Sequence, residues 1–414
     1  MRSIVFVAPL FRPATNRFIG ALAGVRRNVG AMRLGVLSME PASAIDPALK
    51  DHIDAHYQVR DCMDTDELVR GVRGIAPMLG GVDRLVSHLE ELQIPAADAR
   101  ERLGLPGMHG AAARNFREKD RMKSVLRAAG ISVARSRLLR SPPEVMSFVS
   151  EVGLPIVLKP PAGLGARATF CVRTMQELET AVTRLAPTAT APYQAEEYVD
   201  GRESTCETVT IDGRHVWRSG THYLPGPLEV LENPWMQYCV LLPADEHEPS
   251  FRMFDETNGR ALDALGMTTG LSHMEWFMRK DGTPMVNEVG ARPPGANIMP
   301  LMSHAHACDM WSKWAELIAF DRFAPPRRVR AAGTAFFRGQ GRVGGPQRVA
   351  AIRGLREANA EVGMYVVDRK LPVVGQERAT SYEGEGWAVV AHESTAVVMH
   401  ALKRLVELVQ IEYA

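Results

Sequence analysis

Two glutamates, Glu275 and Glu288, lie in apolar segments on either side of the dipeptide Asp281-Gly282. Asp-Gly between two apolar runs predicts a β-hairpin. Side chains alternate between the faces of a strand, so Glu275 is expected to share a face with Phe277, and Glu288 with Val286. The two acids are nearly equidistant from the turn, so their carboxylates should point into one space. Converging, partly buried carboxylates repel each other unless a cation lies between them. The hairpin therefore predicts a divalent metal, and magnesium, which takes one or two carboxylates plus phosphate oxygens, is the expected ion.

Arg292 follows Glu288 by four residues in the stretch VNEVGARPPG. That spacing joins an acid and a base on one face of a helix. Gly290 and the pair Pro293-Pro294 disfavour a regular helix here. The acid and the base are therefore predicted at the end of a strand, and not as a helical salt bridge.

Lys159 ends an apolar run, LPIVLKP, that the loop PAGLGARA separates from a second run, TFCVR. Two strands around a loop are the expected structure. Gly163 and Gly165 allow the backbone to approach a ligand closely, and the charge of Lys159 needs a partner, for which phosphate is suited. A flexible surface hairpin is the alternative. The loop is neither GxxxxGK[ST] nor GxGxxG.

Four acids mark the segment YQAEEYVDGRESTCETVTIDGRHVW, which alternates like a strand and ends at the turn Asp212-Gly213. A solvated strand face explains such acids without any ligand. The four are Glu196, Glu197, Glu203 and Glu207.

The preceding chain supplies the elements that must position these residues. Residues 3–10 and 34–39 are short apolar runs around a helix-like segment that ends near Gly30. This βαβ start, continued by further alternation, predicts a doubly wound, Rossmann-like domain that ends near the Gly/Pro-rich stretch LGLPGMHG. Residues 114–131 then predict one basic amphipathic helix.

Composition limits the classes of partner. The 414 residues contain 46% hydrophobic and 23% charged residues, which is typical of a globular protein of two or three domains. With 49 basic and 48 acidic residues, the net charge of +1 gives no reason to expect nucleic acid or a membrane surface. The short apolar start IVFVAPL is expected to be a first strand, and no run reaches membrane-spanning length. Five widely spaced cysteines disfavour a disulfide framework or a zinc site. Together, the charge balance, the apolar runs and the cysteines lead us to expect a cytoplasmic protein that binds small molecules.

Taken in order, these features resemble the series that characterises ATP-grasp enzymes. The series is a lysine before an amphipathic helix, a strand-lysine-glycine loop-strand unit, EExVxGxE, and two acids thirteen positions apart on a hairpin. The resemblance runs from about residue 110 to 320. It implies an α/β and α+β protein with an N-terminal doubly wound Rossmann-like domain over residues 1–113. A central ATP-grasp subdomain with a small flap over 114–194 and a C-terminal antiparallel-sheet domain over 195–414, including a small cap from about 330, would follow.

The resemblance also implies roles for single residues. Lys119 and Lys159 match the phosphate-contacting lysines, and Gly163 to Arg167 match the flap. Glu196, Glu197 and Val199 match the hinge that holds adenine. Glu203 matches the acid that binds the ribose. Glu275 and Glu288 match the magnesium ligands.

One position departs from the family pattern. Many members place an asparagine two residues after the second acid, where this chain has Gly290. Water or a phosphate oxygen can replace that ligand, because magnesium often keeps several waters. One or two Mg²⁺ ions are therefore expected with ATP, and Mn²⁺ is a possible substitute.

Within the superfamily, EVGARPPG followed by NIMP resembles L-amino-acid ligases of the bacilysin-synthetase kind. This implies an ATP-dependent carboxylate-amine ligase that forms an acyl phosphate, releases ADP and phosphate, and makes a dipeptide or amide. Arg292 would hold a substrate carboxylate or the transferring phosphoryl group. His273 and Gly295 would also face the substrate, although a purely structural histidine is the alternative for His273. Relatives often form dimers, so a homodimer is allowed.

Two other functions stay open. A carboxylase or formyl-phosphate-type enzyme would activate bicarbonate or formate. A nucleotide-binding regulatory protein would keep the fold without chemistry, which Gly290 makes conceivable. Retention of Lys119, Lys159, Glu203 and both hairpin acids argues against that last function.

Overall fold

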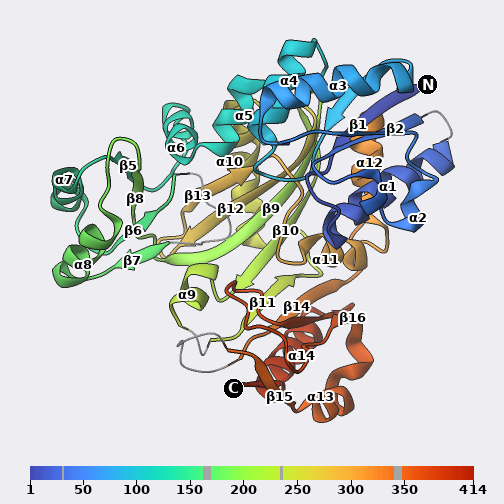
Figure 1. The fold of residues 1–414 in the computed structure, drawn as a ribbon. Helices are drawn as coiled ribbons and strands as arrows, with labels where there is room; N and C mark the ends of the chain where they lie inside the picture. Colours follow the sequence, from blue (N-terminus) through green and yellow to red (C-terminus); the bar gives the residue numbers. More distant parts are fainter. Residues whose placement is uncertain (30–31, 162–168, 234–235, 340–346) are drawn as a thin grey trace.

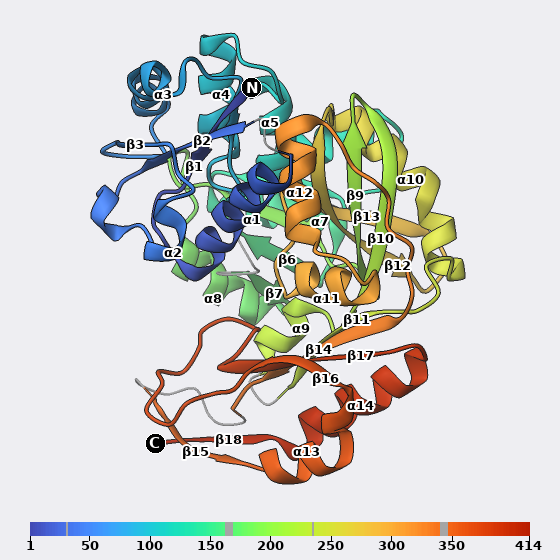
Figure 2. The same ribbon diagram turned by 90° about the vertical axis from the view of Figure 1, so that its right-hand side faces the viewer.

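The computed structural model describes residues 1–29, 32–161, 169–233, 236–339 and 347–414. Within these ranges the strands form a parallel four-stranded sheet, an antiparallel four-stranded sheet, an antiparallel eight-stranded sheet and one two-stranded pair. In Figure 1 the antiparallel four-stranded sheet projects to the left and the N-terminal sheet lies at the upper right, with strands of the eight-stranded sheet between them. Figure 2 shows the C-terminal elements, including α13 and α14, at the bottom of the molecule.

The N-terminal sheet confirms the predicted doubly wound unit. Its strands run parallel in the order β3-β2-β1-β4. Ile4 and Phe6 of β1 pack against α1 and α12, whereas Val5 and Val7 pack against α3, so both faces are covered. The elements are β1 (Arg2–Val7), α1 (Pro13–Val29), β2 (Met32–Ser38), η1 (Ala42–Ala44), α2 (Pro47–Lys50), β3 (Ala55–Gln58), α3 (Thr65–Leu79), β4 (Arg84–Val86) and α4 (Gln93–Leu103).

The single helix predicted over residues 114–131 is instead two helices, α5 (Gly110–Arg117) and α6 (Lys119–Ala128). Glu118 separates them because its backbone is extended, with φ −92° and ψ 106°. Lys119 is thus the first residue of α6. The four-stranded antiparallel sheet follows in the order β5-β8-β6-β7. Its elements are β5 (Ser136–Leu139), α7 (Pro142–Val152), β6 (Ile156–Lys159), β7 (Phe170–Val172), α8 (Met175–Leu185) and β8 (Tyr193–Glu197).

The large sheet is antiparallel throughout, in the order β13-β12-β9-β10-β11-β14-β17-β16. Its strands are β9 (Gly201–Ile211), β10 (Arg214–Leu224), β11 (Tyr238–Leu242), β12 (Gly270–Arg279), β13 (Pro284–Gly290), β14 (Ala331–Phe337), β16 (Val366–Lys370) and β17 (Gly386–His392). The remaining elements are α9 (Pro227–Glu232), α10 (Pro249–Leu265), α11 (Ile298–Ala305), α12 (Met310–Phe320), β15 (Val349–Arg353), α13 (Leu355–Val362), η2 (Gly363–Tyr365), α14 (Thr395–Leu408) and β18 (Gln410–Tyr413).

The segment after residue 330, expected as a small cap, thus contributes β14, β16 and β17 to the large sheet. The division of the chain at 113 and 194 stays a prediction. The first boundary falls within α5 and the second within β8.

The predicted hairpin is present as β12 and β13, with the turn at Asp281-Gly282. Its rear face packs on helices, since Trp276 is fully buried and stacks on Phe254 of α10 with ring centroids 4.2 Å apart. Met122 of α6 belongs to the same core cluster. The other face of the hairpin is thereby held toward the interior of the molecule, where the acids lie.

All five cysteines are free thiols, as the sequence predicts. Among the described residues, no helix combines the length and the apolar character needed to cross a bilayer.

His88 lies in the loop between β4 and α4 and is packed between aromatic rings. Its ring centroid is 5.6 Å from that of Phe6 and 4.4 Å from that of Phe18. The buried Nδ1 atom has no hydrogen-bond partner among the described residues. Burial lowers the pKa of His88 from 6.5 to about 4. The neutral imidazole is therefore part of the packing that holds this loop.

A stability measurement tests this environment. Because its folded pKa is depressed, His88 contributes stability above pH 6.5, and that stability is lost as the pH falls toward about 4. The wild type should lose up to about 3 kcal/mol relative to His88→Gln over this window, as measured by urea unfolding. His247→Gln, at an exposed histidine, is the control and should follow the wild type. Parallel curves for His88→Gln and the wild type would contradict the buried, neutral state.

Candidate active site

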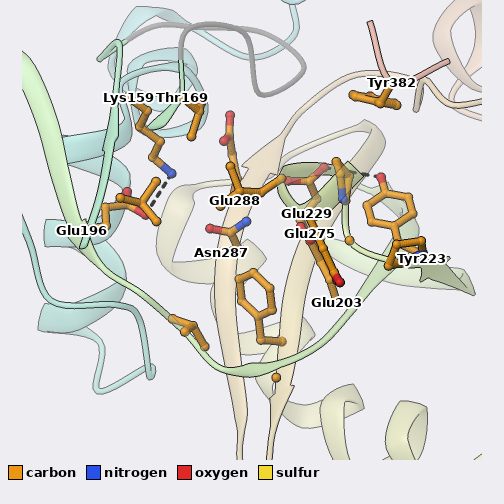
Figure 3. A pocket seen from close by; sticks show the side chains of 18 of the residues that line it. Lys159, Thr169, Glu196, Glu203, Tyr223, Glu229, Glu275, Asn287, Glu288 and Tyr382 are labelled. Atoms are coloured by element: carbon orange, nitrogen blue, oxygen red, sulfur yellow. Dashed lines mark hydrogen bonds and ion pairs between the residues drawn. The ribbon is translucent and has the colours of Figure 1, made fainter. Parts of the chain in front are cut away.

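The hairpin brings the two predicted metal ligands together, because Glu275 pairs directly with Glu288 across β12 and β13. A β-bulge follows, since Trp276 pairs with Val286 and leaves Asn287 as an extra residue. The prediction that Glu288 shares a face with Val286 is therefore wrong: the bulge turns Val286 to the rear face, where it is fully buried. Asn287 and Glu288 both line the front cavity instead (Figure 3).

A cavity of about 640 Å³ collects nearly all of the predicted site residues. Its walls come from the loop after β4, from α6 and β6, from the segment joining β8 to β9, from β10 and α9, and from the hairpin. Gly163 and Gly165 lie outside the described residues. The predicted residues that line the cavity are Lys119, Lys159, Glu196, Glu197, Val199, Glu203, His273, Glu275, Glu288, Arg292 and Gly295.

Lys159 is part of a buried ion trio. Its Nζ atom lies 2.9 Å from Glu196 Oε2, and Lys123 Nζ lies 3.1 Å from the same oxygen. Figure 3 shows the contact between Lys159 and Glu196. Burial alone raises the pKa of Glu196, but the two ammonium groups hold it below its usual value. Burial lowers the pKa of Lys123 to about 8 against the opposing charge of Glu196.

Lys123 is a member of this ion trio that the sequence analysis missed. It is 1% exposed and lies one helical turn after Lys119 on α6. The four-residue spacing of two lysines on a helix that also buries Met122 was the available signal.

Lys119 forms an ion pair with Glu288. Burial would raise the pKa of Glu288, but Lys119 and Lys159 together lower it to about 2. The second hairpin acid is therefore ionised and already has a cationic neighbour. Both predicted phosphate-binding lysines thus lie close to carboxylates that line the cavity.

Glu203 lies beside the hairpin acids without such compensation. Burial and the charge of Glu275 hold the pKa of Glu203 well above its usual value, and Lys159 offsets this effect only in part. Asn287 hydrogen-bonds to Glu203 from the bulge. Tyr223 donates a hydrogen bond to Glu275 Oε1 at 3.4 Å. Carboxyl groups therefore crowd together at this end of the hairpin (Figure 3), and the crowding disfavours ionisation of Glu203.

His273 bridges two acids. Its Nδ1 atom lies 2.8 Å from Glu207 Oε1, and its Nε2 atom lies 3.6 Å from Glu275 Oε1. Burial lowers the pKa of His273, but the bonds to Glu207 and Glu275 raise it to about 9 overall. Glu207, which was expected on a strand face, is fully buried and fixes the imidazole from behind. His273 thus has a structural partner and a place in the cavity wall.

Arg292 does not pair with Glu288, in agreement with the sequence analysis. It donates from Nε and Nη2 to Glu90 Oε2 at 2.9 and 2.8 Å, and from Nη1 to the carbonyl oxygen of Pro293 at 3.0 Å. Glu90 also accepts a bond from Arg117 at 3.1 Å. Glu90 was missed, because it precedes the segment that carries the resemblance, and its only signal is the acid pair in HLEELQ, which solvated loops also contain.

The hairpin offers a fit for magnesium, since Glu275 and Glu288 face each other and provide oxygen ligands, and the charge of Glu275 helps to raise the pKa of the neighbouring Glu203. Within the described ranges, no group of three or more His, Cys, Asp or Glu side chains is arranged to hold a metal ion. Gly290 contributes no side-chain ligand, as expected from the sequence. Two carboxylates with water and phosphate oxygens are the donor set that these residues allow.

Glu196 and its neighbour Glu197 allow a matched test of the ion trio. Glu196→Gln leaves two buried ammonium groups facing one another, so urea unfolding should show a loss of about 3 kcal/mol. Glu197→Gln removes a partly exposed ion pair with Arg135 and should cost about 1 kcal/mol or less. Equal losses in the two variants would contradict a special role for the trio.

Comparison with known proteins identifies relatives in sequence. No family model matches the chain. The alanine–anticapsin ligase of Bacillus subtilis (strain 168) is 23% identical over 298 residues, which cover 66% of this chain and 62% of that protein. The L-arginine-specific L-amino acid ligase of Bacillus subtilis is 22% identical over 266 residues, or 63% of this chain and 62% of that protein. The chain therefore spans about 62% of the length of these curated relatives.

Solved structures match over the whole chain. The L-amino acid ligase from Bacillus licheniformis has a TM-score of 0.75 at 20% identity and covers 100% of this chain and 99% of that one. An ADP complex of N5-carboxyaminoimidazole ribonucleotide synthetase has a TM-score of 0.71 at 14% identity and covers 98% and 96%. The chain has the ATP-grasp fold and is similar in sequence and structure to carboxylate-amine ligases.

Proposed function

We propose that the protein is an ATP-dependent carboxylate-amine ligase that joins an amino acid, or a similar carboxylate, to an amine. One observation carries this proposal: a single cavity contains two lysines, two opposed hairpin acids and an arginine held by a buried carboxylate. The names of the relatives, which include an alanine–anticapsin ligase and an L-amino acid ligase, support it.

ATP is proposed to lie along the wall formed by β6 and the segment joining β8 to β9. Lys119 and Lys159 would contact the phosphates. Glu196, Glu197 and Val199 would hold the adenine, and Glu203 would bind the ribose. All of these residues line the same cavity, as contact with a single ATP molecule requires. The roles of Gly163 and Gly165 in a covering flap remain part of the proposal.

Glu275 and Glu288 would hold Mg²⁺, which Mn²⁺ can replace. The ion would supply positive charge to the phosphate oxygens of ATP. Lys119 and Lys159 would also neutralise these phosphates.

The reaction has two steps. A carboxylate oxygen, oriented by Arg292, attacks the γ-phosphorus of ATP, so the bond to ADP breaks and an acyl phosphate forms. The amine nitrogen then attacks the acyl carbon, phosphate leaves with the bonding electrons, and the proton lost by the nitrogen passes to the released phosphate. Arg292, with its permanent charge, stabilises the oxyanion that develops. Enclosure in the cavity keeps water from hydrolysing the acyl phosphate. Lys159 and Arg292 are the proposed catalytic residues, and His273 and Gly295 would contact the substrate.

We further propose that the enzyme acts in the cytoplasm on small molecules, without nucleic acid or a membrane as partner. The resemblance also allows a homodimer, which light scattering can test.

A screen of amino-acid pairs with ATP and Mg²⁺ tests the function. At least one pair should release phosphate and ADP, and mass spectrometry should identify a dipeptide or amide, because acyl-phosphate chemistry cleaves the γ-phosphoryl bond. AMP as the product would contradict the proposal. Release that depends on bicarbonate or formate alone would favour a carboxylase or formyl-phosphate enzyme. No release with any substrate would favour a nucleotide-binding protein.

The hairpin acids can be tested separately. Glu288→Gln should lower turnover by about 100-fold or more, because the metal loses one of its two carboxylates. Asp281→Asn, in the exposed turn of the same hairpin, is the matched control and should keep most of the activity. EDTA should stop the wild-type reaction, and Mg²⁺ or Mn²⁺ should restore it. Full activity of Glu288→Gln would exclude the assigned role.

A further inference from the structure

Glu90 joins three distant segments at the edge of the cavity. It lies in the loop between β4 and α4, and its side chain is 5% exposed. It accepts hydrogen bonds from Arg117 at the end of α5 and from Arg292 just after β13. Glu90 and Arg292 both line the cavity, whereas Arg117 is not part of its described wall. The carboxylate therefore connects the loop after β4 of the N-terminal sheet to the proposed reaction centre.

The hydrogen bonds that Arg292 makes within the protein show which of its N–H groups are left to bind a ligand. A guanidinium has five N–H groups. Nε and one hydrogen of Nη2 point to Glu90, and one hydrogen of Nη1 points to the Pro293 carbonyl. Of the five, two then remain, one on each terminal nitrogen. A pair of donors on the terminal nitrogens is what an arginine uses to bind a carboxylate with two parallel bonds.

We propose that Glu90 is a positioning residue for the acid substrate: it fixes the guanidinium of Arg292 so that the two remaining donors face the carboxylate that is to be activated. This inference rests on the proposed function, in which Arg292 holds that carboxylate.

The charges agree with this role. Two arginines and one carboxylate leave the trio of Arg117, Glu90 and Arg292 with a net charge of +1. Because Glu90 is shared between two guanidinium groups, it compensates the charge of Arg292 only in part. A neutral anchor would accept weaker hydrogen bonds, so the long arginine side chain would lose more rotamer freedom when the substrate binds.

The alternative is that Glu90 only attaches the N-terminal sheet to the rest of the molecule. Glu67 provides a control for that alternative. It is buried in the same N-terminal unit, and it also pairs with two arginines, Arg60 and Arg70. It is not part of the described cavity wall. Glu67→Gln thus imitates the loss of a buried acid that holds two arginines, without touching the site.

The experiment compares Glu90→Gln, Glu67→Gln, Arg292→Lys and the double variant Glu90→Gln/Arg292→Lys. Phosphate release is measured against ATP, and against the total concentration of an equimolar mixture of the twenty common L-amino acids. Glu90→Gln should raise the half-saturating amino-acid concentration by about 10- to 100-fold and that of ATP by less than about threefold. Glu67→Gln should change neither value. The double variant should be little worse than the more impaired single variant, because Glu90 acts through Arg292.

The other outcomes overturn either the inference alone or the proposed function as well. If Arg292→Lys is impaired toward amino acids and Glu90→Gln is not, the inference is wrong and the proposed function stands. Effects that multiply in the double variant would show that Glu90 acts independently of Arg292, which also overturns the inference. If Arg292→Lys binds amino acids normally, the role of Arg292 in the proposed function is wrong and the inference with it. Absence of release by the wild type would overturn the proposed function itself.

Discussion

Balance of buried charge is the constraint on which this cavity depends. Several acids in its wall have cationic partners, among them Glu288 with Lys119, Glu196 with Lys159 and Lys123, and Glu90 with Arg292 and Arg117. Glu203 and Glu275 are compensated less well, and the raised pKa of Glu203 records their proximity. A bound cation would relieve that repulsion, whereas phosphates would compete for Lys119 and Lys159. A nucleotide bound together with its metal would therefore bring positive charge to the acids Glu203 and Glu275 and negative charge to Lys119 and Lys159.

Packing behind the hairpin decides where these charges lie. Trp276 is wedged against Phe254, so β12 cannot slide or rotate without opening the core. Its neighbours along the strand, Glu275 and Phe277, are thereby held on the cavity side. The bulge at Asn287 adds a second polar residue to the same side of β13. An apolar contact on one face of the sheet thus helps to fix which side chains of β12 face the cavity on the other.

Local patterns predicted the hairpin and the strand that ends at Lys159, because each depends on neighbours within a few residues. The acids between 196 and 203 were assigned to the site only through the resemblance, because their local pattern also fits a solvated strand face. The bulge was not predicted, because one extra residue in β13 becomes visible only against its partner β12. The break at Glu118 was hidden in a continuous basic pattern. The contact of Glu90 with Arg292 could not be predicted, because 202 positions separate the two residues and no local sequence pattern links residues so far apart. Contacts of this kind become evident only when the fold brings the segments together.

The two ion trios at the cavity, centred on Glu196 and Glu90, have the same arrangement. This arrangement explains how a buried cation can be available to bind a ligand. In each trio an acid binds an inner cation that lines the cavity, Lys159 or Arg292, and an outer cation that is not part of its described wall, Lys123 or Arg117. Removing the only partner of a buried acid is costly, because the remaining charge is left without compensation. With Lys123 in place, Lys159 can turn toward a phosphate while Glu196 stays paired. Arg292 can offer its two remaining donors to a carboxylate while Glu90 still holds it. Lys123 and Arg117 would then lower the cost of ligand binding without touching the ligand, and the acids they support would keep the inner cations ready in the empty cavity.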